Sequence, residues 1–169
     1  MAGKLRLRPP SAGDIDALVA DMRPLDRQEV EASSGAGWRR ELEHGLATSV
    51  LPFAAEDDDG LAALFGVKPL GLLSDAGQPW MLGTTRMAAH GRSLGLISRR
   101  YIAEASRSFA LLTNYVDARN APSIRFLRWL GFTIEPARPF GAGRLPFHRF
   151  ELRSDKPKCA APPPQARFP

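Results

Sequence analysis

Residues 114–132 read NYVDARNAPSIRFLRWLGF and predict a strand, a short helix and the start of another strand. The preceding residues 111–116, LLTNYV, have the β-branched and aromatic content of a mostly buried strand. Asn120 can cap the helix, and Pro122 sits in its first turn, where no backbone N–H is needed. Gly131 ends the helix in the manner of a C′ glycine. Apolar residues at spacings of three form one stripe along it: Ile124, Leu127 and Leu130.

The N-terminal part of the chain predicts one short strand followed by helices. Residues 4–8 alternate and end at a Pro-Pro pair, which is typical of an edge strand. Ser11 and Asp14 have capping-box spacing, and an amphipathic helix is expected over 13–22. A second helix is predicted to open at Pro24 and to run to about residue 32. Gly-rich residues 33–37 separate it from a third helical face marked by Trp38, Leu42 and Leu46.

From residue 49 the hydrophobic period changes to that of strands. Residues 49–56 and 60–68 are predicted to form a hairpin around the Asp-Gly turn at 57–60. Residues 70–79 are expected to be loop and 80–85 the next strand. A helix over 92–108 leads into the strand at 111–116, so the two flanking strands are predicted to be parallel neighbours. A final strand pair is expected at 132–136 and 147–153.

The block around Asn120 resembles the C-terminal half of GNAT-type N-acetyltransferases. That family has the pattern N-x-x-A-I-x-L-Y-x-K-x-G-F, and matching residues here are Asn120, Ser123, Ile124, Phe126, Leu130, Gly131 and Phe132. Leu127 stands where the family has the tyrosine that often protonates the leaving thiolate. The stretch at 86–93, RMAAHGRS, departs from the family's diphosphate loop, Q/R-x-x-G-x-G/A. Residues 116–132, VDARNAPSIRFLRWLGF, bear a looser resemblance to GNAT-like proteins of short-tailed bacteriophages.

The resemblance implies one mixed α/β sheet of six to seven strands with helices on both faces, and acetyl-CoA as cofactor. In that arrangement the pantetheine arm lies between two splayed parallel strands, here the strand of Leu82 and Thr84 and the strand at 111–116. The cofactor's diphosphate would meet the start of the crossover helix, where free N–H groups favour anions. Arg86, Gly91 and Arg92 are therefore the candidate diphosphate ligands, with a plain loop as the alternative.

Candidate catalytic residues follow from the same comparison. Tyr115 lies on the splayed strand and could replace the missing acid, although packing alone would also explain a tyrosine there. Glu56 at the end of its strand and His90 beside the loop are candidate bases. Asn120 often reaches the cofactor in the family, but its capping role would be sufficient to explain it.

Composition excludes several other classes. With 169 residues and 44% hydrophobic residues the chain has the size and core of one domain. One Cys and three scattered His predict no disulfide within the chain and no metal site. No apolar run approaches a membrane span, and no signal peptide is recognised, so a cytoplasmic location is expected. The net charge of +5 suits a polyanionic ligand, but no nucleic-acid motif is present.

We therefore expect a GNAT-like domain over residues 1–153 and a Pro-rich disordered tail over 154–169. The first functional hypothesis is an acetyl-CoA-dependent N-acyltransferase that acts on a small-molecule or protein amine. The alternative is a non-catalytic GNAT-like protein, for example a phage factor for virion assembly or host interaction, which would act in the host cytoplasm or the virion through a protein partner. The sequence does not choose between them, because fold analogy alone does not establish activity.

Overall fold

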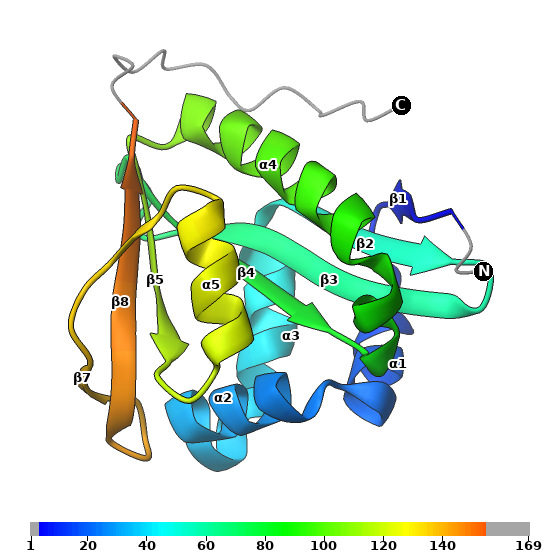
Figure 1. Cartoon of the computed structure of the whole chain (residues 1–169), viewed down its shortest axis with the longest axis horizontal. Coiled ribbons are helices and arrows are strands. Elements are labelled where there is room, and N and C mark those ends of the chain that lie inside the picture. The colour runs from blue at the N-terminus through cyan, green and yellow to red at the C-terminus, as the bar shows by residue number, and fades with distance from the viewer. Residues whose placement is uncertain (1–3, 155–169) are drawn as a thin grey trace.

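The computed structural model describes residues 4–154, so nearly all of the tail predicted over 154–169 lies outside the described residues. Five α-helices and eight strands are found in this range (Figure 1). The helices are α1 (Asp14–Asp21), α2 (Pro24–Ser34), α3 (Trp38–Thr48), α4 (Gly91–Ser108) and α5 (Ala121–Trp129), with short 3-10 helices η1 (Gly35–Gly37) and η2 (Thr85–His90). The strands are β1 (Arg6–Arg8), β2 (Val50–Asp57), β3 (Gly60–Pro69), β4 (Ala76–Gly83), β5 (Leu111–Asp117), β6 (Thr133–Ile134), β7 (Arg138–Phe140) and β8 (Leu145–Arg153).

All eight strands belong to one mixed sheet in the order β1-β2-β3-β4-β5-β8-β6, and β7 also pairs with β8. Among these described strands only the β4–β5 pair is parallel, and α4 is its crossover helix, as predicted. The sheet has more strands than the six or seven expected. The strand expected at 132–136 is observed only as the two-residue β6, and an additional strand, β7, follows Pro136; both pair with β8.

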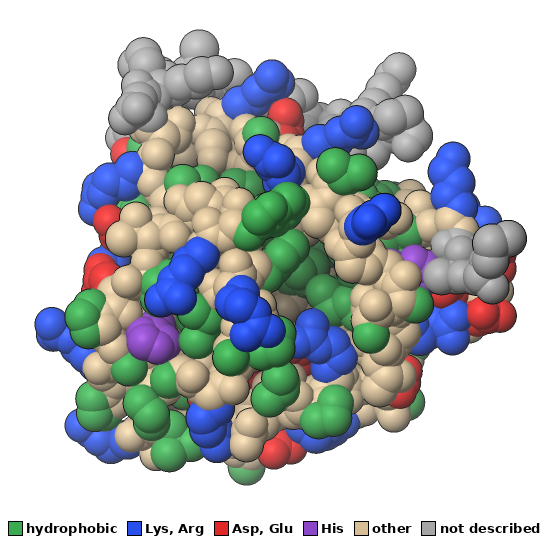
Figure 2. Space-filling view, viewed as in Figure 1, with side chains coloured by type: hydrophobic (Ala, Val, Ile, Leu, Met, Phe, Trp, Pro, Cys, Tyr) green, Lys and Arg blue, Asp and Glu red, His purple; other side chains and the backbone are tan. Residues whose placement is uncertain are grey.

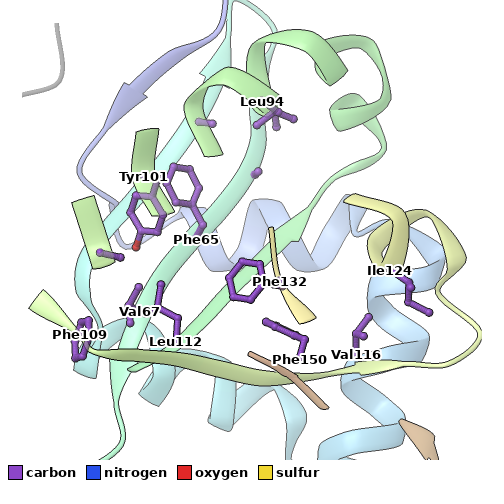
Figure 3. Close-up of a cluster of buried hydrophobic side chains, with 14 of the residues drawn as sticks. Phe65, Val67, Leu94, Tyr101, Phe109, Leu112, Val116, Ile124, Phe132 and Phe150 are labelled. Carbon is purple, nitrogen blue, oxygen red and sulfur yellow. The ribbon is translucent and has the colours of Figure 1, made fainter. Parts of the chain in front are cut away.

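Helices cover both faces of this sheet. In Figure 1, α4 and α5 lie in front of the sheet, and α1 and α3 lie behind it. The larger core forms between the sheet and the α4/α5 layer, where Phe65 and Tyr101 meet edge-to-face with ring centroids 4.9 Å apart (Figure 3). A second core beneath α1 to α3 includes Leu18, Leu42 and Leu64. The two-faced burial explains why β3 is apolar along almost its whole length.

Strand β4 begins earlier than the sequence indicated. The expected strand at 80–85 is observed at Ala76–Gly83, because the Gly77 to Pro79 stretch pairs with β3. A Cβ at Gly77 would lie 2.6 Å from Val67, so only glycine fits the close packing there. The hairpin turn at 57–60 is confirmed: the Asp57 carboxylate accepts hydrogen bonds from the backbone N–H groups of Asp59 and Gly60.

Candidate active site

The parallel strands β4 and β5 separate after two residue pairs. They pair at Ala76–Leu111 and Gly77–Leu112, and their carboxyl ends then diverge in a V (Figure 1). Pro79 has no N–H, so β4 cannot continue the parallel ladder at that position. The side chain of Asn114 bridges the strands instead: its Nδ2 donates to the Pro79 carbonyl (2.9 Å), and its Oδ1 accepts from the Gln78 amide (2.8 Å) and the Tyr115 N–H (2.8 Å).

Helix α2 closes the wide end of this V with two carboxylates one turn apart. Asp26 accepts a hydrogen bond from the N–H of Gly83 on β4 (2.8 Å), and Glu29 accepts one from the N–H of Asp117 on β5 (3.2 Å). The spacing i, i+3 places both side chains on the same helix face. Each therefore replaces the missing strand partner of a backbone group that would otherwise lie unpaired.

The backbone N–H and C=O of one β4 residue, Met81, have no partner among residues 4–154. Thr84 N–H bonds to β3, whereas the N–H and C=O of Gly83 point away from β3, to Asp26 and to the Arg23 N–H. Backbone groups alternate in direction along a strand, so the N–H and C=O of Met81 also point into the gap. Within residues 4–154 no hydrogen bond to either group is found. Met81 thus offers one donor and one acceptor at mid-gap.

A cavity of about 780 Å³ passes through the sheet at the V. Its lining on the α2/α3 side includes Trp38, Trp80 and Tyr115, together with Glu29. On the α4/α5 side the walls are mostly apolar and include Ile102, Phe126, Leu127, Leu130 and Phe132. Figure 2 shows the opening of the cavity on the α4/α5 side as a hollow with hydrophobic walls and Lys and Arg side chains around it. Two ligands could therefore approach the same gap from opposite faces.

Glu29 is the ionisable group best placed for proton transfer. Burial raises its pKa to about 7, although hydrogen bonds from the Asn120 amide (3.0 Å) and the Asp117 N–H oppose this rise. Both donors contact Oε2, and no hydrogen bond of Oε1 is found among the described residues. One carboxylate oxygen is held in place, therefore, while the other remains for a substrate. Burial also raises the pKa of Asp26, against the nearby Arg23 charge.

The predicted cap at Asn120 is observed, because its Oδ1 accepts from the Ser123 N–H (3.3 Å). Its Nδ2 is the donor that holds Glu29, so the cap and the candidate site share one side chain. Tyr115 lines the cavity on the α2/α3 side, with its ring stacked 3.8 Å from that of Phe140. Glu56 lies elsewhere: it does not line the cavity and is ion-paired with Arg8 (2.7 Å).

The predicted diphosphate ligands are only partly brought together. Arg86 belongs to η2 and is bound to Asp57 and Asp59 of the hairpin turn (2.8 and 2.9 Å), and His90 also contacts Asp57 (2.8 Å). Gly91 and Arg92 are exposed at the start of α4, and a Cβ at Gly91 would meet nothing within 4 Å. Of these three candidates, therefore, only Gly91 and Arg92 face open space.

The two strand residues proposed as cofactor ligands differ in position. Leu82 lines the cavity, whereas Thr84 is buried and its hydroxyl donates to the Leu61 carbonyl (2.7 Å). In residues 4–154 no group of three or more His, Cys, Asp or Glu side chains could hold a metal ion. None of the helices described is both long enough and apolar enough to cross a membrane.

Comparison with solved structures places this architecture among the GNAT N-acetyltransferases. The ribosomal-protein-S18-alanine N-acetyltransferase of Escherichia coli superimposes with a TM-score of 0.65 at 18% identity, over 98% of this chain and 100% of that one. Spermidine N-acetyltransferase of Vibrio cholerae, solved with CoA and spermine, gives 0.62 at 16% identity, over 90% and 96%. A protein described as a phosphinothricin N-acetyltransferase gives 0.64 at 17%, over 90% and 100%.

The chain therefore has the GNAT fold, as the block around Asn120 predicted. No protein-family model matches the sequence, and no curated protein does so either. The comparisons do not support the looser resemblance to phage proteins. At this level of identity the likeness establishes the fold, while activity has to be argued from the site.

Sequence reasoning missed Glu29 and Asn114 as site residues. Glu29 lies 88 positions from Asp117 and 91 from Asn120, its two partners, so no local pattern links them. It also resembles an ordinary polar position of an amphipathic helix. One signal was present, since Asp26 and Glu29 sit one turn apart on the helix that precedes the Gly-rich break at 33–37.

Proposed function

We propose that the chain is an acetyl-CoA-dependent N-acyltransferase that acts on a primary amine. The observation that carries this proposal is the cavity through the V. The carboxyl of Glu29, whose pKa is about 7, lines one side of the cavity, and an apolar channel forms the other side. Such a passage lets an acceptor and a thioester meet from opposite faces of a sheet. The surrounding fold is the GNAT fold, and one structure that shares it was solved with CoA.

The residues fit the cofactor in three respects. The apolar walls given by α4 and α5 suit the pantetheine arm, and the Met81 peptide group suits one of its amides or the thioester carbonyl. Exposed Arg92 and the first N–H groups of α4 suit the diphosphate. Bound acetyl-CoA would supply an acetyl group activated as a thioester. Leu82 and Asn120 remain proposed ligands along the arm.

In this scheme Glu29 Oε1 accepts a proton from the acceptor ammonium, so that the amine nitrogen can attack the thioester carbonyl carbon. The Met81 N–H donates to the carbonyl oxygen as negative charge develops there. The new C–N bond forms as the C–S bond breaks, and the thiolate takes a proton. Tyr115 is the tyrosine of the cavity's α2/α3 wall, and we keep it as the proposed acid because Leu127 has no hydroxyl.

Two measurements test the proposal together. Isothermal titration with acetyl-CoA should show binding in the micromolar range, and thiol release should appear when amines are added. The amine panel should include a small arylalkylamine, a polyamine and short peptides with free N-termini. Absence of binding heat at millimolar acetyl-CoA would overturn the proposal and favour a non-catalytic, partner-binding role.

A further inference from the structure

At the narrow end of the V, a side chain bridges the two strands just beyond the point where their pairing stops. After Gly77 the backbones of β4 and β5 no longer bond to each other, and Asn114 connects them through Pro79 and Gln78. Its three hydrogen bonds span both strands, and the carboxamide lines the cavity. The wall at this end of the gap is thus a single polar group fixed in orientation.

The direction in which a thioester would lie follows from the chain path, given the proposed function on which this inference rests. Helix α4 follows β4 through η2, so its N-terminus is near the wide end of the V. An arm anchored there by its diphosphate enters at the wide end and places its acyl group deepest. Met81 and Pro79 are two strand positions apart, roughly 6.6 Å. Beyond a carbonyl held by the Met81 N–H there is space for a short acyl chain before the Asn114 amide.

We infer that Asn114 limits the acyl donor to short chains, so that it acts as the specificity residue for acyl length. An apolar chain longer than the gap would have to displace the carboxamide from the Pro79 carbonyl and the Tyr115 N–H. Those two groups would then be left without a partner in a partly buried gap, which is unfavourable. A two-carbon acyl group avoids this conflict.

The experiment compares acetyl-, propionyl- and butyryl-CoA with one amine acceptor from the panel above, using kcat/KM for each donor. The wild type should prefer acetyl-CoA over butyryl-CoA by at least tenfold. Asn114→Ala opens the end of the gap and should reduce that preference at least tenfold. Asn114→Leu keeps the volume but removes the hydrogen bonds that hold the side chain in place, and should also reduce the preference, though less than Asn114→Ala because its side chain still fills the gap. Because each result is a ratio within one variant, a general loss of stability does not change it.

The outcomes separate this inference from the proposed function. A wild type that transfers butyryl as readily as acetyl overturns the inference while the transferase proposal stands. An unchanged ratio in Asn114→Ala also overturns it. If Asn114→Ala does not fold, Asn114→Ser keeps a small polar side chain at this position, is shorter than asparagine and should shift the ratio in the same direction. A wild type that binds none of the three donors overturns both proposals.

Discussion

Among single residues, Glu29 combines a cost in stability with a role in the proposed chemistry. Its carboxyl is half-buried on α2, and its pKa of about 7 lies well above the ordinary value because of that burial. A base that titrates near neutral pH is poised to exchange protons under working conditions. The same placement disfavours the charged form, so the folded protein carries an electrostatic penalty at the pH where the base is active.

Replacing Glu29 by Gln should lower kcat by about 10²–10⁴, the usual contribution of a general base. In the wild type, kcat/KM should rise as the pH increases through about 7, because only the ionised carboxylate accepts a proton. Steady-state kinetics between pH 5.5 and 9 check both points. Glu31→Gln, on the same helix but exposed and ion-paired with Arg27 (3.8 Å), is the matched control. Equal loss in both variants would remove Glu29 from the mechanism.

The same substitution should stabilise the protein at alkaline pH. The pKa of Glu29 is higher in the folded state than in the unfolded chain, so the folded state binds more protons between about pH 4.5 and 7. The contribution of this group to stability therefore falls as the pH rises through that interval. The amide of Glu29→Gln has no charge to desolvate, so the variant's melting temperature should exceed the wild-type value by about 2–4 °C or more at pH 8. Below about pH 4.5 the two curves should converge, and a constant difference would contradict this account.

Among the secondary-structure elements, the segment that leads into α4 contains two arginines with different surroundings, although the sequence predicted the same role for both. Arg86 is bound to Asp57 and Asp59, and it ties η2 to the β2–β3 turn. Arg92 lies one residue inside α4, is exposed, and has no ion pair among residues 4–154. A residue already paired would have to leave its partner to bind phosphate. Arg92 is therefore the stronger candidate for the proposed diphosphate contact.

Replacing Arg92 by Ala should weaken acetyl-CoA binding about tenfold or more, since a charge-assisted hydrogen bond to phosphate contributes roughly 1.5–3 kcal/mol. Arg86→Ala should mainly lower the melting temperature through the loss of its contacts with Asp57. Arg153, paired with Glu151 on β8, is the control and should leave affinity unchanged when replaced. Titration calorimetry and thermal melts of the three variants separate the two roles. Equal affinity for Arg92→Ala and wild type would remove the phosphate contact.

Across the molecule as a whole, three carboxylates with lowered pKa values lie in hydrogen-bonded pairs at separate places in the fold. Hydrogen bonds from Arg8 lower the pKa of Asp14, and hydrogen bonds from Arg86 and then His90 lower that of Asp57. Burial opposes the effect at Asp117, but hydrogen bonds from Arg119 still lower its pKa. These residues are at the α1 start, the β2–β3 turn and the β5 end. Their ionised forms therefore stabilise both halves of the sheet.

The melting temperature should consequently fall steeply as the pH decreases below about 4. Each lowered pKa adds stability above the ordinary carboxyl value, and that stability is lost as the pH falls through the folded-state pKa. Asp57→Asn should lie well below wild type at pH 7 and approach it near pH 2. Asp58→Asn, whose side chain is 69% exposed, should follow the wild-type curve. Scanning calorimetry across this range is the test, and a pH-independent deficit for Asp57→Asn would refute it.

Local sequence was enough to specify the elements that depend on near neighbours. The Asn120 cap, the Gly131 end of α5, the hairpin at 57–60 and the crossover helix all formed where local hydrogen bonding and hydrophobic periodicity predicted them. That was sufficient for the GNAT fold, because element order and one parallel pair leave few ways to build the sheet. Strand ends were less well predicted, since β4 and β6 owe their limits to partners on other strands.

The composition of the candidate site, by contrast, depended on tertiary contacts. Glu29 acquires its raised pKa from burial against β5 and α5, which lie about 90 positions away in the chain. Asn114 resembles any strand residue, and its bridging position appears only once Pro79 faces it across the gap. The sequence predicted Arg86 as a phosphate ligand, but in the folded chain its guanidinium is paired with Asp57. Burial, pKa and pairing are properties of spatial neighbours, and the fold brings those neighbours together from segments that no local pattern relates.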